Sequence, residues 1–112
     1  MTTVKYVAGG RWQSDDYGEI GALAYSYNGL DWFNAPSSID MFNWVNGVGC
    51  NGTMWIAVGK PGTDSMAYSY DGINWVGLGT TYLDFMGSGI AWSDDLGMWV
   101  AVGRGTWNVA YS

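Results

Sequence analysis

The chain has 112 residues, enough for one domain, with ten acidic and four basic side chains and a formal net charge of -6. It has one cysteine and no histidine, which excludes an intrachain disulfide, a histidine-dependent catalytic triad and imidazole-ligated zinc. Because the negative charge repels phosphate backbones and anionic lipid, we expect neither a nucleic-acid partner nor a membrane partner.

Two sequence elements recur along the chain. AYSYNGLDW at 24–32 returns 43 residues later as AYSYDGINW at 67–75, and AYS returns again at 110–112. MWIAVGK at 54–60 returns 44 residues later as MWVAVGR at 98–104, and YVAGG at 6–10 is a degenerate earlier copy. A period of this length falls within the range of propeller blades, about 40–50 residues.

In chain order, the residues predict about ten short strands and no helix. The first copy supplies strands near 4–9, 22–27 and 31–34, the middle copy strands at 44–50, 54–59, 66–70 and 74–78, and the last copy strands at 88–93, 98–103 and 107–112. The predicted fold is all-β, with about 2.5 four-stranded β-propeller blades in one repeat domain, 1–112. It divides into a partial blade 4–34, a full blade 44–78 and a partial blade 88–112.

Tight turns are predicted wherever Asn or Asp precedes Gly between apolar runs. This dipeptide is typical of type I′ hairpin turns, which need φ > 0. It occurs at Asn28-Gly29, Asn46-Gly47, Asn51-Gly52 and Asp71-Gly72.

The segment S-Y-[ND]-G-x-[DN]-W at 26–32 and 69–75 closely resembles the Asp-box signature of bacterial-neuraminidase-type repeats in sialidase-like propellers, one residue shorter between Asp and Gly. With the WVAVG-type strand, it is also similar to tandem repeats of uncharacterised proteins from large DNA viruses, phages and bacteria. In these families the box is a folding element remote from the catalytic centre. We therefore assign structural roles to the two boxes, with each Trp packed between neighbouring sheets: Ser26, Asn28, Gly29, Trp32, Ser69, Asp71, Gly72 and Trp75.

About 2.5 blades leave one apolar sheet face uncovered at each end, whereas a closed ring of blades covers all of them. Each face measures roughly several hundred Å², near the largest apolar patch that soluble monomers tolerate. We therefore expect the chain to partner itself in a closed homo-oligomer, with a dimer as the simplest solution. The alternative is that the sequence is a piece of a longer propeller.

The copies differ most in the connection between the second and third strands. In the first copy it is the eleven-residue segment RWQSDDYGEIG at 11–21, which we expect to be a rim loop, where ligands commonly bind. Aromatic rings beside acidic and amide groups suit sugars, although a solvated loop or a subunit contact is the alternative. The candidate ligand-binding residues are Trp12, Gln13, Asp15, Asp16, Tyr17, Glu19 and Trp107.

An enzyme would need groups that the sequence lacks. The sialidase resemblance implies an arginine cluster, but the only arginines are Arg11 and Arg104. The ten acids offer no pair with a spacing that singles out a glycosidase, and Asp94-Asp95 is better explained as a hairpin turn than as a calcium site. We expect no catalytic residue, no metal and no cofactor.

The function that follows is a non-enzymatic, lectin-like binding module that recognises glycans or a surface. The alternative is a structural or assembly protein, for example of a virion, that docks another protein. The N-terminal segment lacks the apolar core of a signal peptide, so we expect a cytoplasmic or virion-associated protein. We expect Cys50 to be a small buried side chain.

Overall fold

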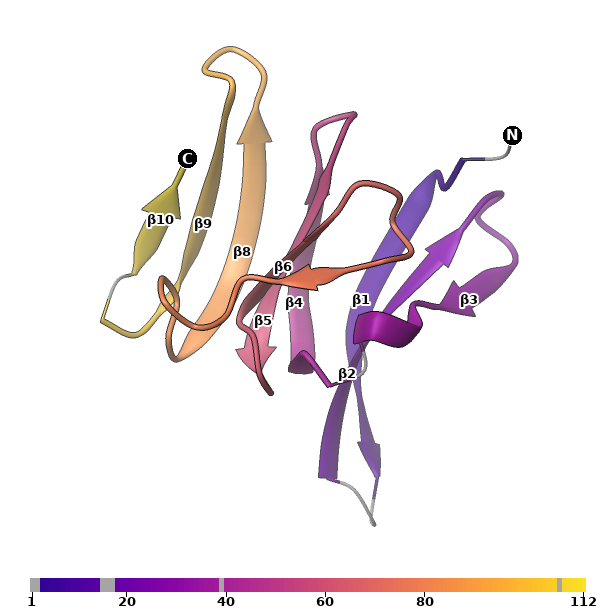
Figure 1. The fold of residues 1–112 in the computed structure, drawn as a ribbon, viewed down its shortest axis with the longest axis horizontal. Coiled ribbons are helices and arrows are strands. Elements are labelled where there is room, and N and C mark those ends of the chain that lie inside the picture. Colours follow the sequence, from indigo (N-terminus) through magenta and orange to yellow (C-terminus); the bar gives the residue numbers. More distant parts are fainter. Residues whose placement is uncertain (1–2, 15–17, 39, 107) are drawn as a thin grey trace.

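The computed structural model describes residues 3–14, 18–38, 40–106 and 108–112, and for 12–14 and 18–21 it describes the backbone alone. The described residues form ten strands and one short 3-10 helix, η1 (Pro36–Ser38), so the all-β expectation is confirmed. The strands make three antiparallel sheets that stand side by side in a molecule of 45 × 39 × 18 Å (Figure 1).

Each sheet is a meander in which neighbours in sequence are neighbours in space. The first sheet contains β1 (Tyr6–Ser14), β2 (Gly18–Ser26) and β3 (Trp32–Asn34). The middle sheet contains β4 (Phe42–Cys50), β5 (Trp55–Pro61), β6 (Met66–Ser69) and β7 (Val76–Gly77). The last sheet contains β8 (Met86–Ser93), β9 (Met98–Arg104) and β10 (Val109–Tyr111).

The sequence repeat is also a structural repeat, because equivalent residues pair in the same register in all three sheets. The first residue of each apolar run lies opposite the serine of the AYS element, and in the last sheet these two residues exchange backbone hydrogen bonds of 3.3 and 3.2 Å. The equivalent pairs are Tyr6 with Ser26, Trp55 with Ser69, and Trp99 with Ser112. β5 and β9 also pair with a preceding strand, β4 and β8, whereas β1 is the edge of its sheet.

The middle sheet is buried on both faces, because successive side chains of a strand point to opposite sides. Ala57 faces the first sheet, and its neighbours Ile56 and Val58 face the last sheet. The core between the first and middle sheets consists of Leu23, Ala35, Phe42, Val45, Ala57, Ala67 and Trp75. The core between the middle and last sheets consists of Ile56, Val58, Leu83, Trp99 and Ala101.

A glycine and a valine meet at both junctions between sheets, but they exchange positions from one junction to the other. Gly9 stands where β5 has Val58, and a Cβ on Gly9 would overlap the side chain of Val45. At the next junction the sizes are reversed, because a Cβ on Gly87 would lie 2.6 Å from Cβ of Val58. One glycine at each junction therefore allows two strands to approach closely, β1 and β4 at the first junction and β5 and β8 at the second.

The expected rim loop at 11–21 is wrong for the residues that the structure describes. Residues 11–14 continue β1 and residues 18–21 belong to β2, paired in register from Arg11 opposite Gly21 to Ser14 opposite Gly18. Trp12 lies opposite Ile20, and aromatic and β-branched residues favour paired strands. The greater length of this connection suggested a loop, but its described residues extend two paired strands.

The turn prediction is correct for the glycines and wrong for the turn type. Gly29, Gly52 and Gly72 have φ of 82°, 94° and 79°, but the Asn or Asp before each glycine does not have positive φ, as type I′ would require. Asn46-Gly47 is not a turn, because it lies within β4 at a register shift between Val45 and Gly47.

Cys50 is exposed, so the expectation that it is buried is wrong. It ends β4 at the hairpin turn, where its Sγ accepts the backbone N–H of Gly52 at 3.3 Å. The position at the turn, rather than the apolar character of the side chain, decides its exposure.

Candidate functional site

The second box turn satisfies its own polar groups. The Ser69 hydroxyl accepts the Gly72 N–H at 2.8 Å and donates to Oδ1 of Asp71 at 2.9 Å. Asp71 Oδ1 also accepts the backbone N–H groups of Ile73 and Asn74, both at 2.8 Å, and its Oδ2 accepts the Asn74 side-chain amide at 2.8 Å. Side-chain oxygens thus replace a strand ladder as acceptors in the turn.

The first box turn has the same geometry with the acid and the amide exchanged. Ser26 Oγ accepts the Gly29 N–H at 2.7 Å. Asn28 Oδ1 accepts the N–H groups of Leu30 and Asp31 at 2.8 and 2.9 Å, and its Nδ2 donates to Asp31 Oδ2 at 2.9 Å. The polar atoms of both boxes are engaged within their own turns, as a folding element requires.

The four donors around Asp71 determine its pKa. Burial raises the pKa of this carboxyl, but the hydrogen bonds from Asn74, Ile73 and Ser69 outweigh that effect and lower the pKa from its ordinary value of 3.8 to about 2. Because the folded-state pKa is depressed, the stabilisation is present above pH 3.8 and is lost as the pH falls toward 2.

Acid unfolding should therefore become less steep in Asp71→Asn, which carries the neutral amide that Asn28 provides in the first box. We expect the wild-type free energy of unfolding to fall between pH 4 and about pH 2 and that of the variant to fall less, as measured by urea titration at each pH. Some slope should remain, because hydrogen bonds from the backbone and side chain of Thr106 also lower the pKa of Asp84. Equal slopes in the two proteins would contradict this account.

The two box tryptophans differ in burial although their local bonding is the same. Each indole N–H donates at 3.2 Å to the carbonyl of the box glycine, Gly29 or Gly72. Trp75 is 4% exposed against the first sheet, where its backbone N–H also donates to Ser37 Oγ at 3.0 Å. Trp32 is 44% exposed, because the described chain has no sheet beyond it, so its packing between sheets stays a prediction.

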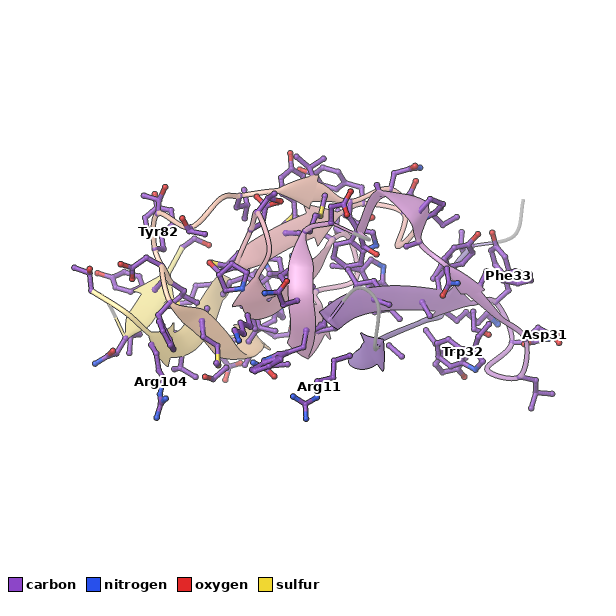
Figure 2. The ribbon with its side chains drawn as sticks, turned by 90° about the horizontal axis from the view of Figure 1, so that it is seen from below. Arg11, Asp31, Trp32, Phe33, Tyr82 and Arg104 are labelled. Atoms are coloured by element: carbon purple, nitrogen blue, oxygen red, sulfur yellow. The ribbon has the colours of Figure 1, made fainter. Side chains whose placement is uncertain are left out.

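The opposite end of the molecule carries a second uncovered face, on the side of the last sheet that points away from the middle sheet. Val102 on β9 is 45% exposed and Tyr111 on β10 is 76% exposed. Their repeat equivalents in the middle sheet are Val58, which is fully buried, and Tyr68, which packs against the core. Figure 2 shows the two ends, with Trp32 and Phe33 at one and Tyr82 and Arg104 toward the other.

The described structure places three of the predicted ligand-binding residues together on one hairpin, with Gln13 directly opposite Glu19 and Trp12 next to Gln13. Trp12 and Gln13 lie on β1 and Glu19 on β2, with only the backbone described. Four others lie outside the described residues: Asp15, Asp16, Tyr17 and Trp107. The ligand hypothesis thus concerns a hairpin that projects beyond the ends of β4 and β5 (Figure 1).

A cation–aromatic cluster at the start of β4 was missed by the sequence analysis. The Arg11 guanidinium lies 5.0 Å and the Lys60 ammonium 4.4 Å from the ring centroid of Trp44. The same ring lines a hollow of about 400 Å³ together with Asn46 and Met86. The repeat could have indicated this cluster, because Arg11 and Lys60 occupy equivalent positions directly after the glycine that ends the apolar run.

A second hollow, of about 220 Å³, lies between the middle and last sheets. Its wall is apolar and aromatic and includes Met66, Leu78 and Trp99. Trp99 is 5% exposed, and its buried indole N–H has no hydrogen-bond partner within the described residues. In the sequence these are ordinary apolar residues, so only the alignment of the repeats could have indicated the hollow.

Across the ranges that the structure describes, no three His, Cys, Asp or Glu side chains are grouped as a metal site would require. No helix in the same ranges is long and apolar enough to cross a membrane. Comparison of the chain with protein-family models, with characterised proteins and with solved structures found no match. The likeness to Asp-box repeats therefore rests on the box sequence alone.

Proposed function

We propose that this chain is a non-enzymatic module of the β-propeller type whose copies associate through the two uncovered sheet faces. The observation that carries the proposal is the contrast between Trp32 and Trp75, which share a motif, a register and a local hydrogen bond but are 44% and 4% exposed. A residue whose equivalent is buried by a neighbouring sheet is expected to have such a neighbour as well.

The two end faces match each other because each carries one half of a junction that the chain already makes. The uncovered face of the first sheet presents Tyr6, Ala8, Ala24 and Trp32, whose equivalents Trp55, Ala57, Ala67 and Trp75 pack against a preceding sheet. The uncovered face of the last sheet presents the other half: Val100, Val102, Val109 and Tyr111. A second copy stacked head to tail would cover one face with the other, and such a contact closes into a ring or continues as an open stack.

The role that this geometry supports best is assembly, in which stacked sheets form a scaffold for docking another protein. Lectin-like glycan recognition is the second candidate, favoured by the projecting β1–β2 hairpin that carries Trp12 (Figure 1). A glycan array probed with the assembled protein and with Trp12→Ala separates the two. Binding that Trp12→Ala abolishes at unchanged oligomer mass would favour the lectin.

Native mass spectrometry over a range of protein concentrations tests the association. We expect masses above the 12.2 kDa of one chain, and we expect Val102→Asp to restore the single-chain mass by placing a charge in the contact. Leu96→Asp is the matched control, because Leu96 is an exposed apolar residue on the β8–β9 turn, away from both faces. A monodisperse 12.2 kDa species that unfolds cooperatively would contradict the proposal.

A further inference from the structure

The hollow between the middle and last sheets lies at the junction that repeats the one occupied by Trp75. At the junction of the first and middle sheets, the Trp75 side chain belongs to a cluster with Leu23, Ala35, Ala57 and Ala67. The repeat offset places Met66, Leu78, Ala101 and Ala110 at the equivalent positions, and all four line the hollow. The same kind of wall therefore surrounds an indole at one junction and a space of about 220 Å³ at the other.

One polar position near the hollow in sequence also matches the surroundings of Trp75, although it is not part of the lining. Thr80 stands at the repeat position of Ser37, whose hydroxyl accepts the Trp75 backbone N–H at 3.0 Å. The indole of Trp99 forms part of the wall, and its buried N–H has no acceptor among the described residues.

The edge next to the hollow can accept a strand. β10 is the outer strand of the last sheet, whereas its equivalent β6 pairs with β7 through Ala67 opposite Gly77 and Tyr68 opposite Val76. The corresponding positions on β10 are Ala110, which lines the hollow, and its neighbour Tyr111. A strand added there would place the side chain directly before its first paired residue over the hollow, as Trp75 directly precedes Val76 of β7.

We propose that this hollow is a binding site for an indole side chain carried on an extended peptide that adds to β10. The partner is a segment of another protein with a tryptophan just before a short strand, of the kind that residues 69–78 form in this chain. The site needs only the middle and last sheets of one chain, so it does not depend on association between copies.

The test uses the full chain and a peptide with the sequence of residues 69–78, SYDGINWVGL, labelled at its N-terminus and followed by fluorescence anisotropy. The matched peptide has alanine in place of the tryptophan. Because the indole supplies most of the buried apolar area, we expect the tryptophan peptide to bind at least about tenfold more tightly. Equal affinity of the two peptides, or binding by neither, overturns the proposal.

A pair of protein variants locates the binding. Ala110→Leu fills the hollow and should abolish peptide binding, whereas Ala91→Leu, at an exposed position on β8 that does not line the hollow, should leave it unchanged. Tight binding that Ala110→Leu does not weaken would place the peptide elsewhere and overturn the site. Masses above one chain together with no peptide binding would reject this site while leaving the stacking of copies intact.

Discussion

Replacing Trp75 with alanine should lower the free energy of unfolding by about 3–5 kcal/mol, the range for truncating a buried tryptophan. The side chain is 4% exposed in the core between the first and middle sheets, and its indole N–H donates to the Gly72 carbonyl at 3.2 Å. The truncation leaves a cavity that sheets joined by tight turns can close only in part. Guanidinium titration of the wild type and of Trp75→Ala measures the difference, and a loss below about 1 kcal/mol would contradict the described junction.

Trp32→Ala is the matched variant, because Trp32 makes the same local hydrogen bond at 3.2 Å but is 44% exposed. At concentrations where the protein is a single chain, we expect it to cost about 1 kcal/mol or less. Where copies are stacked, Trp32→Ala should lower both the oligomer mass and the unfolding free energy, because the indole is then covered as Trp75 is. A variant that changes neither quantity at any concentration would count against stacking through this face.

The strands were predictable from the sequence because the same pattern of residues occurs more than once. An apolar run such as 54–59 is ambiguous alone, but its recurrence at 98–103, beside a second recurring element, fixes both as paired strands. Asx-Gly dipeptides then mark the turns, since only the glycine needs positive φ in the observed geometry. Local residue chemistry and the repeat offset therefore account for most of the fold.

The long hairpin was not predictable in the same way, because it has no second copy. Residues 11–21 contain strand-forming residues such as Trp12 and Ile20 together with acids that favour turns. In the structure Trp12 and Ile20 belong to paired strands, which the sequence of this segment alone did not indicate. The turn predicted at Asn46-Gly47 was wrong for a related reason. Asn-Gly occurs in turns and also in β-bulges, and here it lies at a register shift in the pairing of β4 with β5.

The candidate site was less predictable than the fold, because the residues around the hollow come from five strands and the β7–β8 connection. Met66, Leu78 and Ala110 are each unremarkable apolar residues at their own positions in the sequence. They indicate a site only when they are compared with their repeat equivalents Leu23, Ala35 and Ala67. That comparison requires knowing that these equivalents surround Trp75. A hollow defined by a missing contact leaves no motif in the chain, so its discovery needed the structure.

The exchange of glycine and valine between the two junctions predicts a strong coupling between Gly9 and Val45. Gly9→Val alone places a branched side chain against Val45 and should cost about 1–3 kcal/mol through overpacking. Val45→Gly alone removes a buried side chain and adds backbone freedom within a strand, for a cost of about 2–4 kcal/mol.

The double variant Gly9→Val with Val45→Gly recreates the arrangement of Val58 and Gly87, in which the valine is on the second strand and the glycine on the next sheet. It should therefore be more stable than the sum of the single variants by about 1–3 kcal/mol, measured by urea titration of all four proteins. Gly10→Val is the control, because a Cβ on Gly10 meets no atom within 4 Å and the change should be nearly neutral. In the observed packing, each single variant produces either a clash or a cavity at this contact. If the losses in unfolding free energy of the two single variants simply add in the double variant, other contacts set the distance between the sheets.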